Sequence, residues 1–249
     1  MDDRILKTVA LDRGVILADS GNHRIRKVNL QYGTITTVAG NGSGEYRGDG
    51  GLSTNASLKN PFGVALDKKG RIYIADTGNH RIRMVDIDKG ITTIAGSIDE
   101  GMSGDDGVAT QAKLKDPRDV AVDSEGNVYI ADYGNNLIRM IRADTKVITT
   151  IAGKKDAKDR IQGNPRRYDG DNKPALGAGL DPLGIALDGV GGLLVADAYN
   201  HRIRKIDLKS GIITTVVGTG RPGNKTDGQY AEAAELKSPS SVAVSSRGE

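Results

Sequence analysis

The sequence predicts an all-β protein built from a repeated unit of four short antiparallel strands, and three observations support this. A stretch beginning Asp-x-x-Asn recurs four times, at Asp19, Asp76, Asp132 and Asp197, which are separated by 57, 56 and 65 residues. Each copy lies among short runs of Val, Ile and Thr that are bounded by Gly, Asp or Asn, a pattern typical of strands and tight turns. Glycine accounts for 34 of the 249 residues, which also favours many turns.

One unit, residues 61–96, illustrates the pattern. Apolar runs at 63–67, 71–75, 81–85 and 91–95 alternate with turn sequences at 68–70, 76–79 and 88–90. Four such strands form an antiparallel meander, and meanders that repeat at this length are typical of the blades of a β-propeller. We therefore predict one propeller domain over residues 1–249, with four full blades at about 5–40, 61–96, 117–153 and 182–218.

The strands of a unit differ in polarity. The first two are apolar on both faces, as expected for a sheet packed between two neighbours. The fourth contains a Thr-Thr pair in every unit and suits an outer, partly hydrated edge.

Long inserts separate the predicted blades, at residues 41–60, 97–116, 154–181 and 219–238. Each has a Gly/Asp segment and then Ala and Leu before a proline, for which we expect one short helical turn. The expected anchors of the inserts are Leu58, Leu114, Leu180 and Leu236. Because turns alternate between the two ends of a meander, the inserts and the Asp-x-x-Asn turns are expected on the same face.

Three copies of the turn continue as Asn-His-Arg-Ile and resemble the signature of NHL repeats, which form β-propellers. These copies are Asp19-x-x-Asn22-His23-Arg24, Asp76-x-x-Asn79-His80-Arg81 and Asp197-x-x-Asn200-His201-Arg202. The third copy in chain order keeps Asp132 and Asn135, but Asn136 replaces the histidine and Leu137 the arginine. The resemblance covers nearly the whole chain.

The last residues, about 239–247, resemble the first strand of a unit. This extra strand either completes the first blade or begins a fifth in a larger or open ring, and the second alternative is slightly favoured. Open blade edges can pair with another chain, so self-association is expected to be possible.

Composition limits the chemistry. There is no cysteine, which removes disulfides, thiolate catalysis and Cys-ligated zinc. The net charge of +3 neither requires nor excludes an anionic partner. No run is long enough for a membrane helix. The opening Met1-Asp2-Asp3-Arg4 lacks a signal-peptide pattern, and the compartment stays open, with a secreted or cell-surface parent protein among the alternatives.

The recurrence of the Asp-x-x-Asn-His-Arg group favours a structural role over a catalytic one, because an active site is normally unique. Relatives that are amidating lyases hold zinc with channel histidines, but His23, His80 and His201 are predicted on separate turns. Asp169-Gly170-Asp171-Asn172 is the closest approach to a calcium loop, and a solvated turn is favoured there. Neither calcium nor zinc is expected. The tripeptide Arg47-Gly48-Asp49 reads as a recurring turn and not as an adhesion motif.

The favoured function is a non-catalytic scaffold that presents its inserts to a protein or other macromolecule. The predicted contacts are basic and aromatic residues of the third insert and one acidic residue in each of the others: Lys154, Lys155, Lys158, Arg160, Arg166, Arg167 and Tyr168, with Asp49, Asp105 and Asp227. A nucleic acid is a weaker candidate, suggested by tripartite-motif relatives that bind RNA.

Two alternatives remain open at this stage. One is a metal-dependent lyase or lactonase with a site in the central channel, for which Asp67, Asp123 and Asp188 are the repeated acidic candidates. The other is a structural spacer in a larger multidomain protein.

Overall fold

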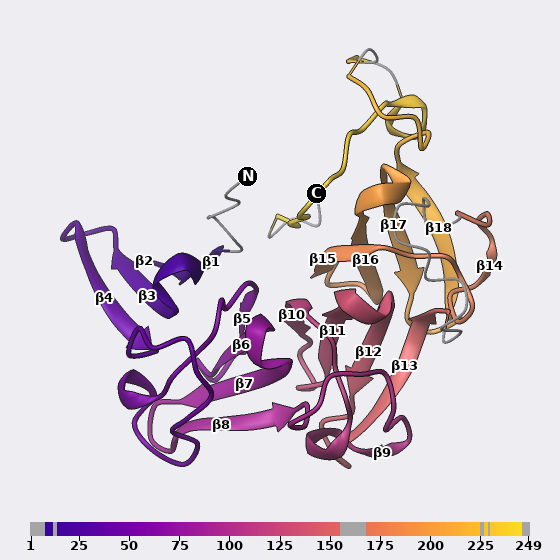
Figure 1. Cartoon of the computed structure of the whole chain (residues 1–249). Coiled ribbons are helices and arrows are strands. Elements are labelled where there is room, and N and C mark those ends of the chain that lie inside the picture. The colour runs from indigo at the N-terminus through magenta and orange to yellow at the C-terminus, as the bar shows by residue number, and fades with distance from the viewer. Residues whose placement is uncertain (1–7, 12–13, 155–167, 225–226, 229, 246–249) are drawn as a thin grey trace. The chain divides into compact units, whose positions relative to one another are not determined.

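A computed structural model describes residues 8–11, 14–154, 168–224, 227–228 and 230–245 (Figure 1). The fold is all-β with antiparallel sheets, as predicted. The chain forms two compact units, one comprising residues 1–128 and 141–148 and the other residues 129–140 and 149–249. Within the described residues, no helix has the length and apolar character needed to cross a membrane.

The first unit contains two sheets whose strands follow chain order. The first sheet consists of β1 (Thr8–Leu11), β2 (Gly14–Asp19), β3 (Arg24–Asn29) and β4 (Thr34–Ala39). The second consists of β5 (Val64–Leu66), β6 (Ile72–Asp76), β7 (Arg81–Asp86) and β8 (Gly90–Ala95). Both are the four-stranded meanders that the sequence predicts.

The other two sheets each carry a fifth, two-residue strand. The third sheet has the order β10-β11-β12-β13-β9, with β9 (Gly107–Val108), β10 (Pro117–Val122), β11 (Val128–Asp132), β12 (Leu137–Ile141) and β13 (Val147–Gly153). In the second unit, the fourth sheet has the order β14-β18-β17-β16-β15, with β14 (Lys173–Pro174), β15 (Pro182–Leu187), β16 (Gly192–Asp197), β17 (Arg202–Asp207) and β18 (Ile212–Val217).

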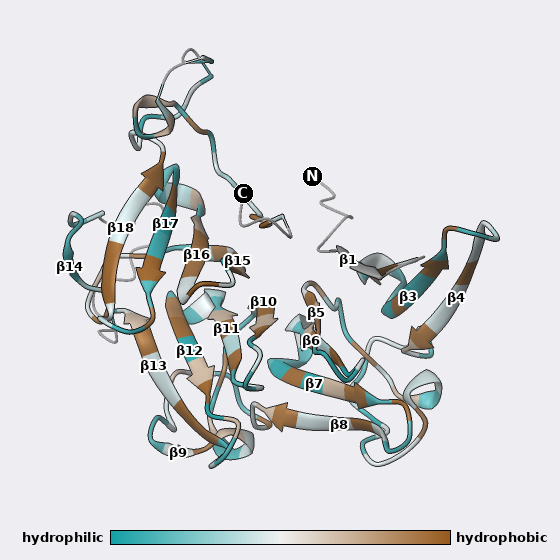
Figure 2. Cartoon of the chain, turned by 180° about the vertical axis from the view of Figure 1, so that it is seen from behind, coloured by the Kyte–Doolittle hydropathy of each residue, from teal (hydrophilic) through white to brown (hydrophobic). Residues whose placement is uncertain are grey.

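The core consists of aliphatic side chains from the inner strands. Every residue of β6 and of β11 is buried, which agrees with the predicted two-sided packing. Of the four predicted anchors, Leu58, Leu114 and Leu180 are at most 1% exposed, whereas Leu236 is only partly buried. Figure 2 shows hydrophilic and hydrophobic stretches alternating along β3, β7 and β17.

Each Asp-x-x-Asn turn is a single turn of 3₁₀ helix between the second and third strands of its sheet. The four turns are η1 (Ser20–Asn22), η3 (Thr77–Asn79), η5 (Tyr133–Asn135) and η7 (Ala198–Asn200). The next residue is left-handed in all four. A glycine lies at the end of the fourth strand of every sheet, directly after β4, β8 and β18 and as the last residue of β13. A Cβ on Gly96 would lie 2.4 Å from the His80 carbonyl oxygen. The backbone at the end of the fourth strand therefore packs against the residue that follows the 3₁₀ turn of the same sheet.

Among the described residues, the predicted short helical turn occurs in the first, second and fourth inserts, as η2 (Ser53–Asn55), η4 (Ala109–Gln111) and η8 (Ala231–Ala233). The described parts of the first, second and third inserts add backbone to the outer strand of the sheet that follows them. The amides of Gly50, Asp106 and Asn172 donate to the carbonyls of Ile91, Ile148 and Ile213 at 2.8, 2.8 and 2.9 Å. The fourth strands remain the outer full-length strands and keep several half-buried residues, which agrees with the predicted partly hydrated edge, while the Gly/Asp segments pair with part of that edge.

The predicted extra strand at 239–247 is not a strand over its described part, residues 239–245. Its backbone nevertheless lies against β15, since a Cβ on Gly184 would be 2.8 Å from the Ser240 carbonyl oxygen and the Ser241 Cα. A Cβ on Gly63 would likewise lie 2.8 Å from the carbonyl oxygen of Arg118 in β10. The segment thus occupies the place of a first strand, but a strand assignment also requires a hydrogen-bonded partner.

Candidate functional site

The aspartate of each repeat turn collects donors from three parts of the chain. Asp76 is fully buried. Its Oδ2 accepts from Asn79 Nδ2 at 2.9 Å and from Arg83 Nη1 at 3.4 Å. Its Oδ1 accepts from the amide of Lys59 at 2.7 Å, at the end of the preceding insert. One carboxylate thus joins the turn, the third strand and the insert.

The contacts of the aspartate with the turn asparagine and with the arginine of the third strand recur in every sheet. Asn Nδ2 to Asp Oδ distances are 2.9, 2.9, 2.7 and 2.8 Å at Asp19, Asp76, Asp132 and Asp197. The arginine seven residues after each aspartate lies 3.4, 3.4, 3.8 and 3.4 Å from it, at Arg26, Arg83, Arg139 and Arg204. Sequence reasoning missed these arginines. Their signal was recurrence in all four copies, including the copy that lacks the histidine and the first arginine.

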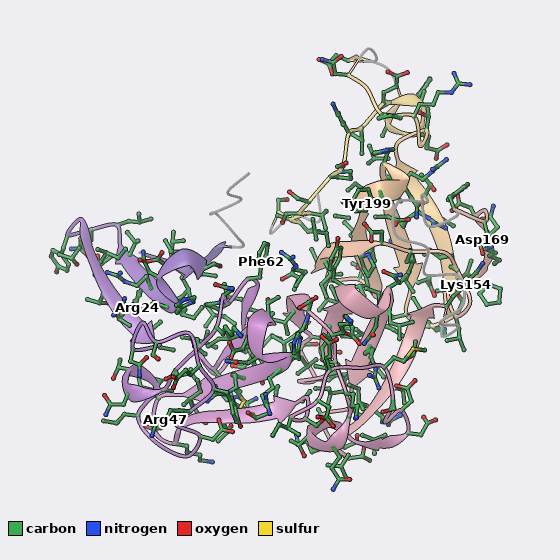
Figure 3. All side chains as sticks on the ribbon, in the orientation of Figure 1. Arg24, Arg47, Phe62, Lys154, Asp169 and Tyr199 are labelled. Atoms are coloured by element: carbon green, nitrogen blue, oxygen red, sulfur yellow. The ribbon has the colours of Figure 1, made fainter. Side chains whose placement is uncertain are left out.

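The first arginine of the motif bonds to the backbone carbonyl of the turn asparagine. Arg81 Nη1 donates to the Asn79 carbonyl at 2.8 Å, and Arg202 Nη1 to the Asn200 carbonyl at 3.0 Å. Arg24 makes the same contact with Asn22 at 3.4 Å (Figure 3). This arginine therefore stabilises the turn through its backbone.

The histidines act as backbone acceptors. Nδ1 of His23, His80 and His201 accepts the amides of Asn60, Asp116 and Ser238, each at 3.1 Å. Those three residues precede prolines and have left-handed φ values of 46°, 44° and 48°. Each histidine therefore fixes the end of the insert that follows it. Among the described residues, no group of three or more His, Asp or Glu side chains is arranged to hold a metal ion.

Burial dominates the electrostatics of the central aspartates. Removal from water raises the pKa of Asp76, despite its hydrogen bonds and the Arg83 guanidinium. It raises the pKa of Asp197 to about 6, and the nearby Asp181 carboxylate adds to that shift. Desolvation thus outweighs the attraction of the buried arginine in both turns.

The first insert places a tyrosine and an aspartate on the arginines of the second sheet. The guanidinium of Arg81 stacks on the ring of Tyr46, with its Cζ 3.8 Å from the ring centroid. The Cζ of Arg83 is 5.0 Å from the same centroid. Asp49 accepts from Arg83 Nη2 at 2.6 Å, from Tyr46 Oη at 2.7 Å and from the Thr93 amide at 3.2 Å. These hydrogen bonds lower the pKa of Asp49 against the opposing effect of burial, which is the largest single contribution.

The third insert repeats this clamp on the fourth sheet. Tyr168 lies 3.7 Å from the Arg202 guanidinium and 4.9 Å from that of Arg204. Asp171 accepts a hydrogen bond from Tyr168 Oη at 2.8 Å and forms an ion pair with Arg204 Nη2 at 2.9 Å. We call this arrangement, a Tyr-x-x-Asp segment of an insert on two arginines of the next sheet, the insert clamp.

The predicted contact residues therefore have varied surroundings. Asp49 and Tyr168 are engaged in insert clamps, and Asp105 is half-buried. Lys154 pairs with Asp169 at 3.2 Å, and both side chains are labelled in Figure 3. Asp227 is exposed and forms no hydrogen bond or ion pair with any described residue. The remaining basic residues, Lys155, Lys158, Arg160, Arg166 and Arg167, lie outside the described residues, so their role stays a prediction.

The acidic residues of the enzymatic alternative each hold the turn after a first strand. Asp67 Oδ1 accepts the amides of Lys69 and Arg71, both at 2.9 Å. Asp123 accepts the amides of Glu125 and Asn127 at 3.0 and 2.8 Å, and Asp188 accepts those of Val190 and Gly192 at 2.9 and 2.7 Å. These are the hydrogen bonds expected of an aspartate that stabilises a turn.

Two family models match the chain. The Teneurin NHL domain model matches residues 34–100 and 97–171, and the NHL repeat model matches residues 180–206. Together they cover more than half of the sequence and include the second, third and fourth repeat turns and most of the first three inserts.

Named relatives show partial identity over nearly the whole chain. It is 28% identical to Protein SUPPRESSOR OF QUENCHING 1, chloroplastic, of Arabidopsis thaliana over 93% of its length. It is 27% identical to human NHL repeat-containing protein 2 over 97%, and 28% identical to mouse Teneurin-1 over 96%. The chain spans only 22%, 36% and 10% of the lengths of these relatives.

Solved structures share the fold at low identity. An auxiliary nutrient binding protein from Bacteroides thetaiotaomicron aligns with a TM-score of 0.61 at 16% identity, over 98% of this chain and 54% of that one. A nidogen/laminin complex aligns with 0.56 at 20% identity, over 86% and 65%. Staphylococcus aureus virginiamycin B lyase aligns with 0.50 at 17% identity, over 86% and 55%.

Proposed function

The chain belongs to the NHL-repeat family, and from this premise we propose that it is a non-catalytic interaction module of the β-propeller type. Each of the four sheets is one blade in this proposal, and the inserts present the contact surface to a protein partner. The proposal rests on how the polar groups and the apolar groups of the inserts are distributed.

The polar groups of the repeat are engaged within the fold. The aspartate, asparagine and second arginine of each turn bond to one another, and the histidines bond to the backbone of the inserts. These bonds tie each turn to the third strand of its sheet and to the inserts, and such networks hold a surface in a fixed arrangement. Rigid presentation lowers the ordering cost of binding, which suits a scaffold.

The observation that carries the proposal is a repeated exposed apolar position in the inserts. Three residues after the Gly/Asp-segment aspartate lie Leu52, Val108, Pro174 and Tyr230. Leu52 is 70% exposed, Val108 48% and Tyr230 88%, and Pro174 is exposed as well. Leu52, Val108 and Pro174 remain exposed although their segments pair with the following sheet. Exposed apolar side chains that recur beside a rigid frame favour contact with another protein.

The test combines crosslinking with affinity measurement. A photoreactive amino acid at Leu52 or Val108 is expected to crosslink one protein from a lysate of the source organism. Matched controls at Ile87 and Val190, which are 94% and 85% exposed on other turns, should not capture that protein.

The affinity of the captured protein then tests the surface directly. Leu52→Asp is expected to raise its Kd by about tenfold or more, as for a buried interface anchor. Ile87→Asp should leave the Kd unchanged. Equal crosslinking at the control positions, or an unchanged Kd for Leu52→Asp and Val108→Asp, would contradict the proposal.

A further inference from the structure

Among the described residues, no insert pairs with the outer edge of the first sheet, whereas an insert pairs with the outer edge of each of the other three sheets. Ile35 in β4 is 51% exposed, whereas its equivalents Ile91, Ile148 and Ile213 are fully buried. The three buried residues accept a hydrogen bond from an insert amide, as given above. Among the described residues, none donates to the Ile35 carbonyl from the outer side of β4. This edge is therefore open for pairing with a further strand.

The ion pair between Arg26 and Asp19 in the first sheet is also partly exposed to solvent. The side chains of Arg26 and Asp19 are 24% and 26% exposed, whereas those of Arg83 and Asp76 are both 0% exposed. Arg83 is covered by Asp49, but no described aspartate other than Asp19 pairs with Arg26. An insert clamp thus fits this sheet in both its backbone and its charge.

The fourth insert carries the Asp-Gly part of a clamp segment at residues 227–228, with Asn224 in place of the tyrosine, and neither of these two residues forms a hydrogen bond with a described strand. Its base is fixed, because the Thr219 amide donates to the Ala234 carbonyl at 2.9 Å and the Ser238 amide to His201. Gly228 has φ 80°, matching the left-handed Gly50, Asp106 and Asn172 that begin strand pairing in the other inserts. Asp227, directly before it, has the position of Asp49 and Asp171 but forms no bond with a described residue.

We propose that the fourth insert of one copy docks on β4 of a second copy of this chain. Asp227 pairs with Arg26 of the partner copy, and the Gly228 amide donates to the carbonyl of its Ile35. The two surfaces differ, so the contact is heterologous and builds head-to-tail assemblies. Three intramolecular examples of the backbone contact, at β8, β13 and β18, and two of the aspartate–arginine pair, Asp49–Arg83 and Asp171–Arg204, give the geometry.

The first measurement is sedimentation of the purified 249-residue chain over a wide concentration range. The wild type is expected to associate as concentration rises. Ile35→Lys places a charge on the exposed edge, and Asp227→Asn removes the carboxylate charge without changing its shape. Each is expected to weaken association by about tenfold or more, because Ile35→Lys would bury an unpaired charge at the contact and Asp227→Asn removes the charge that pairs with Arg26. Ile87→Lys and Asp88→Asn, at exposed positions of the second sheet, are the matched controls and should associate like the wild type.

Mixing the two blocked variants decides the geometry. Ile35→Lys retains a functional insert, and Asp227→Asn retains a functional edge, so the mixture should form a 1:1 dimer that does not grow further. A thermal midpoint equal to that of the control variant shows that each variant folds. A wild type that stays monomeric at every concentration overturns the proposal, as does association that both variants preserve or a mixture without the 1:1 dimer.

Discussion

His23, His80 and His201 combine two local requirements at a single position. Their φ values of 55°, 54° and 54° are left-handed, and their Nδ1 atoms accept the last amide before a proline. Asn136 fills the equivalent position with φ 59°. Asparagine tolerates the left-handed region better than most residues, but the buried Asn136 Oδ1 has no hydrogen-bond partner. The third repeat therefore meets the conformational requirement without the hydrogen bond.

Substitutions at His80 should separate these two contributions. His80→Asn loses the bond to the Asp116 amide and is expected to lower the free energy of unfolding by about 1 kcal/mol. His80→Ala also lacks the polar side chain that eases the left-handed conformation, which costs about 1 kcal/mol more. Urea denaturation of both variants measures the difference. Equal losses for Asn and Ala would contradict a conformational role for this position.

The inserts are elements that stabilise a neighbouring sheet and not only connections. Tyr46 and Asp49 of the first insert cover two arginines of the second sheet, while His23 of the first sheet fixes the end of that insert. Each insert of this kind is therefore held by the sheet before it and by the sheet after it. In such repeat architectures, stability depends on contacts between neighbouring units.

Asp49 and Asp227 provide a matched test of the insert clamp. Asp49→Asn weakens the contact with the fully buried Arg83 and is expected to cost about 1–2 kcal/mol of unfolding free energy, after allowance for the partial exposure of Asp49. Asp227→Asn should change it by less than about 0.5 kcal/mol, provided the chain is dilute enough to be monomeric. Thermal or urea denaturation gives both values. A loss at Asp227 as large as that at Asp49 would contradict this account.

The pH dependence of the whole molecule reflects its buried aspartates. Burial raises the pKa of Asp197 to about 6, from an ordinary value of 3.8, and raises that of Asp76 as well. An acid with a raised folded-state pKa holds its proton more tightly when folded. Its contribution to stability therefore increases as pH falls through 6 and is lost as pH rises.

Replacing Asp197 should reduce this dependence. Between pH 7.5 and pH 5, the Asp197 carboxyl alone is expected to add about 1 kcal/mol to the unfolding free energy of the wild type. Asp197→Asn should lack that gain. Asp207→Asn is the control, because hydrogen bonds from Ser210 lower the pKa of Asp207 and its titration falls outside this range. Identical pH slopes for the wild type and Asp197→Asn would rule out a raised pKa at Asp197.

The sequence by itself determined the class of fold and its repeat. Strand length, the alternation of apolar runs with Gly, Asp and Asn, and the spacing of the Asp-x-x-Asn turns depend on short-range conformational preferences, which are legible residue by residue. It also indicated the short helical turns of the inserts and most of their leucine anchors, since those patterns are local too.

Only the tertiary structure decided which polar residues meet. Arg83 and Asp49 are far apart in the sequence, and their contact depends on an insert folding back onto the next sheet. The same holds for the backbone pairing that covers β8, β13 and β18 and leaves Ile35 exposed on β4. Hydrogen bonds and ion pairs between distant segments depend on the packed arrangement, and a residue pattern alone does not specify the partner.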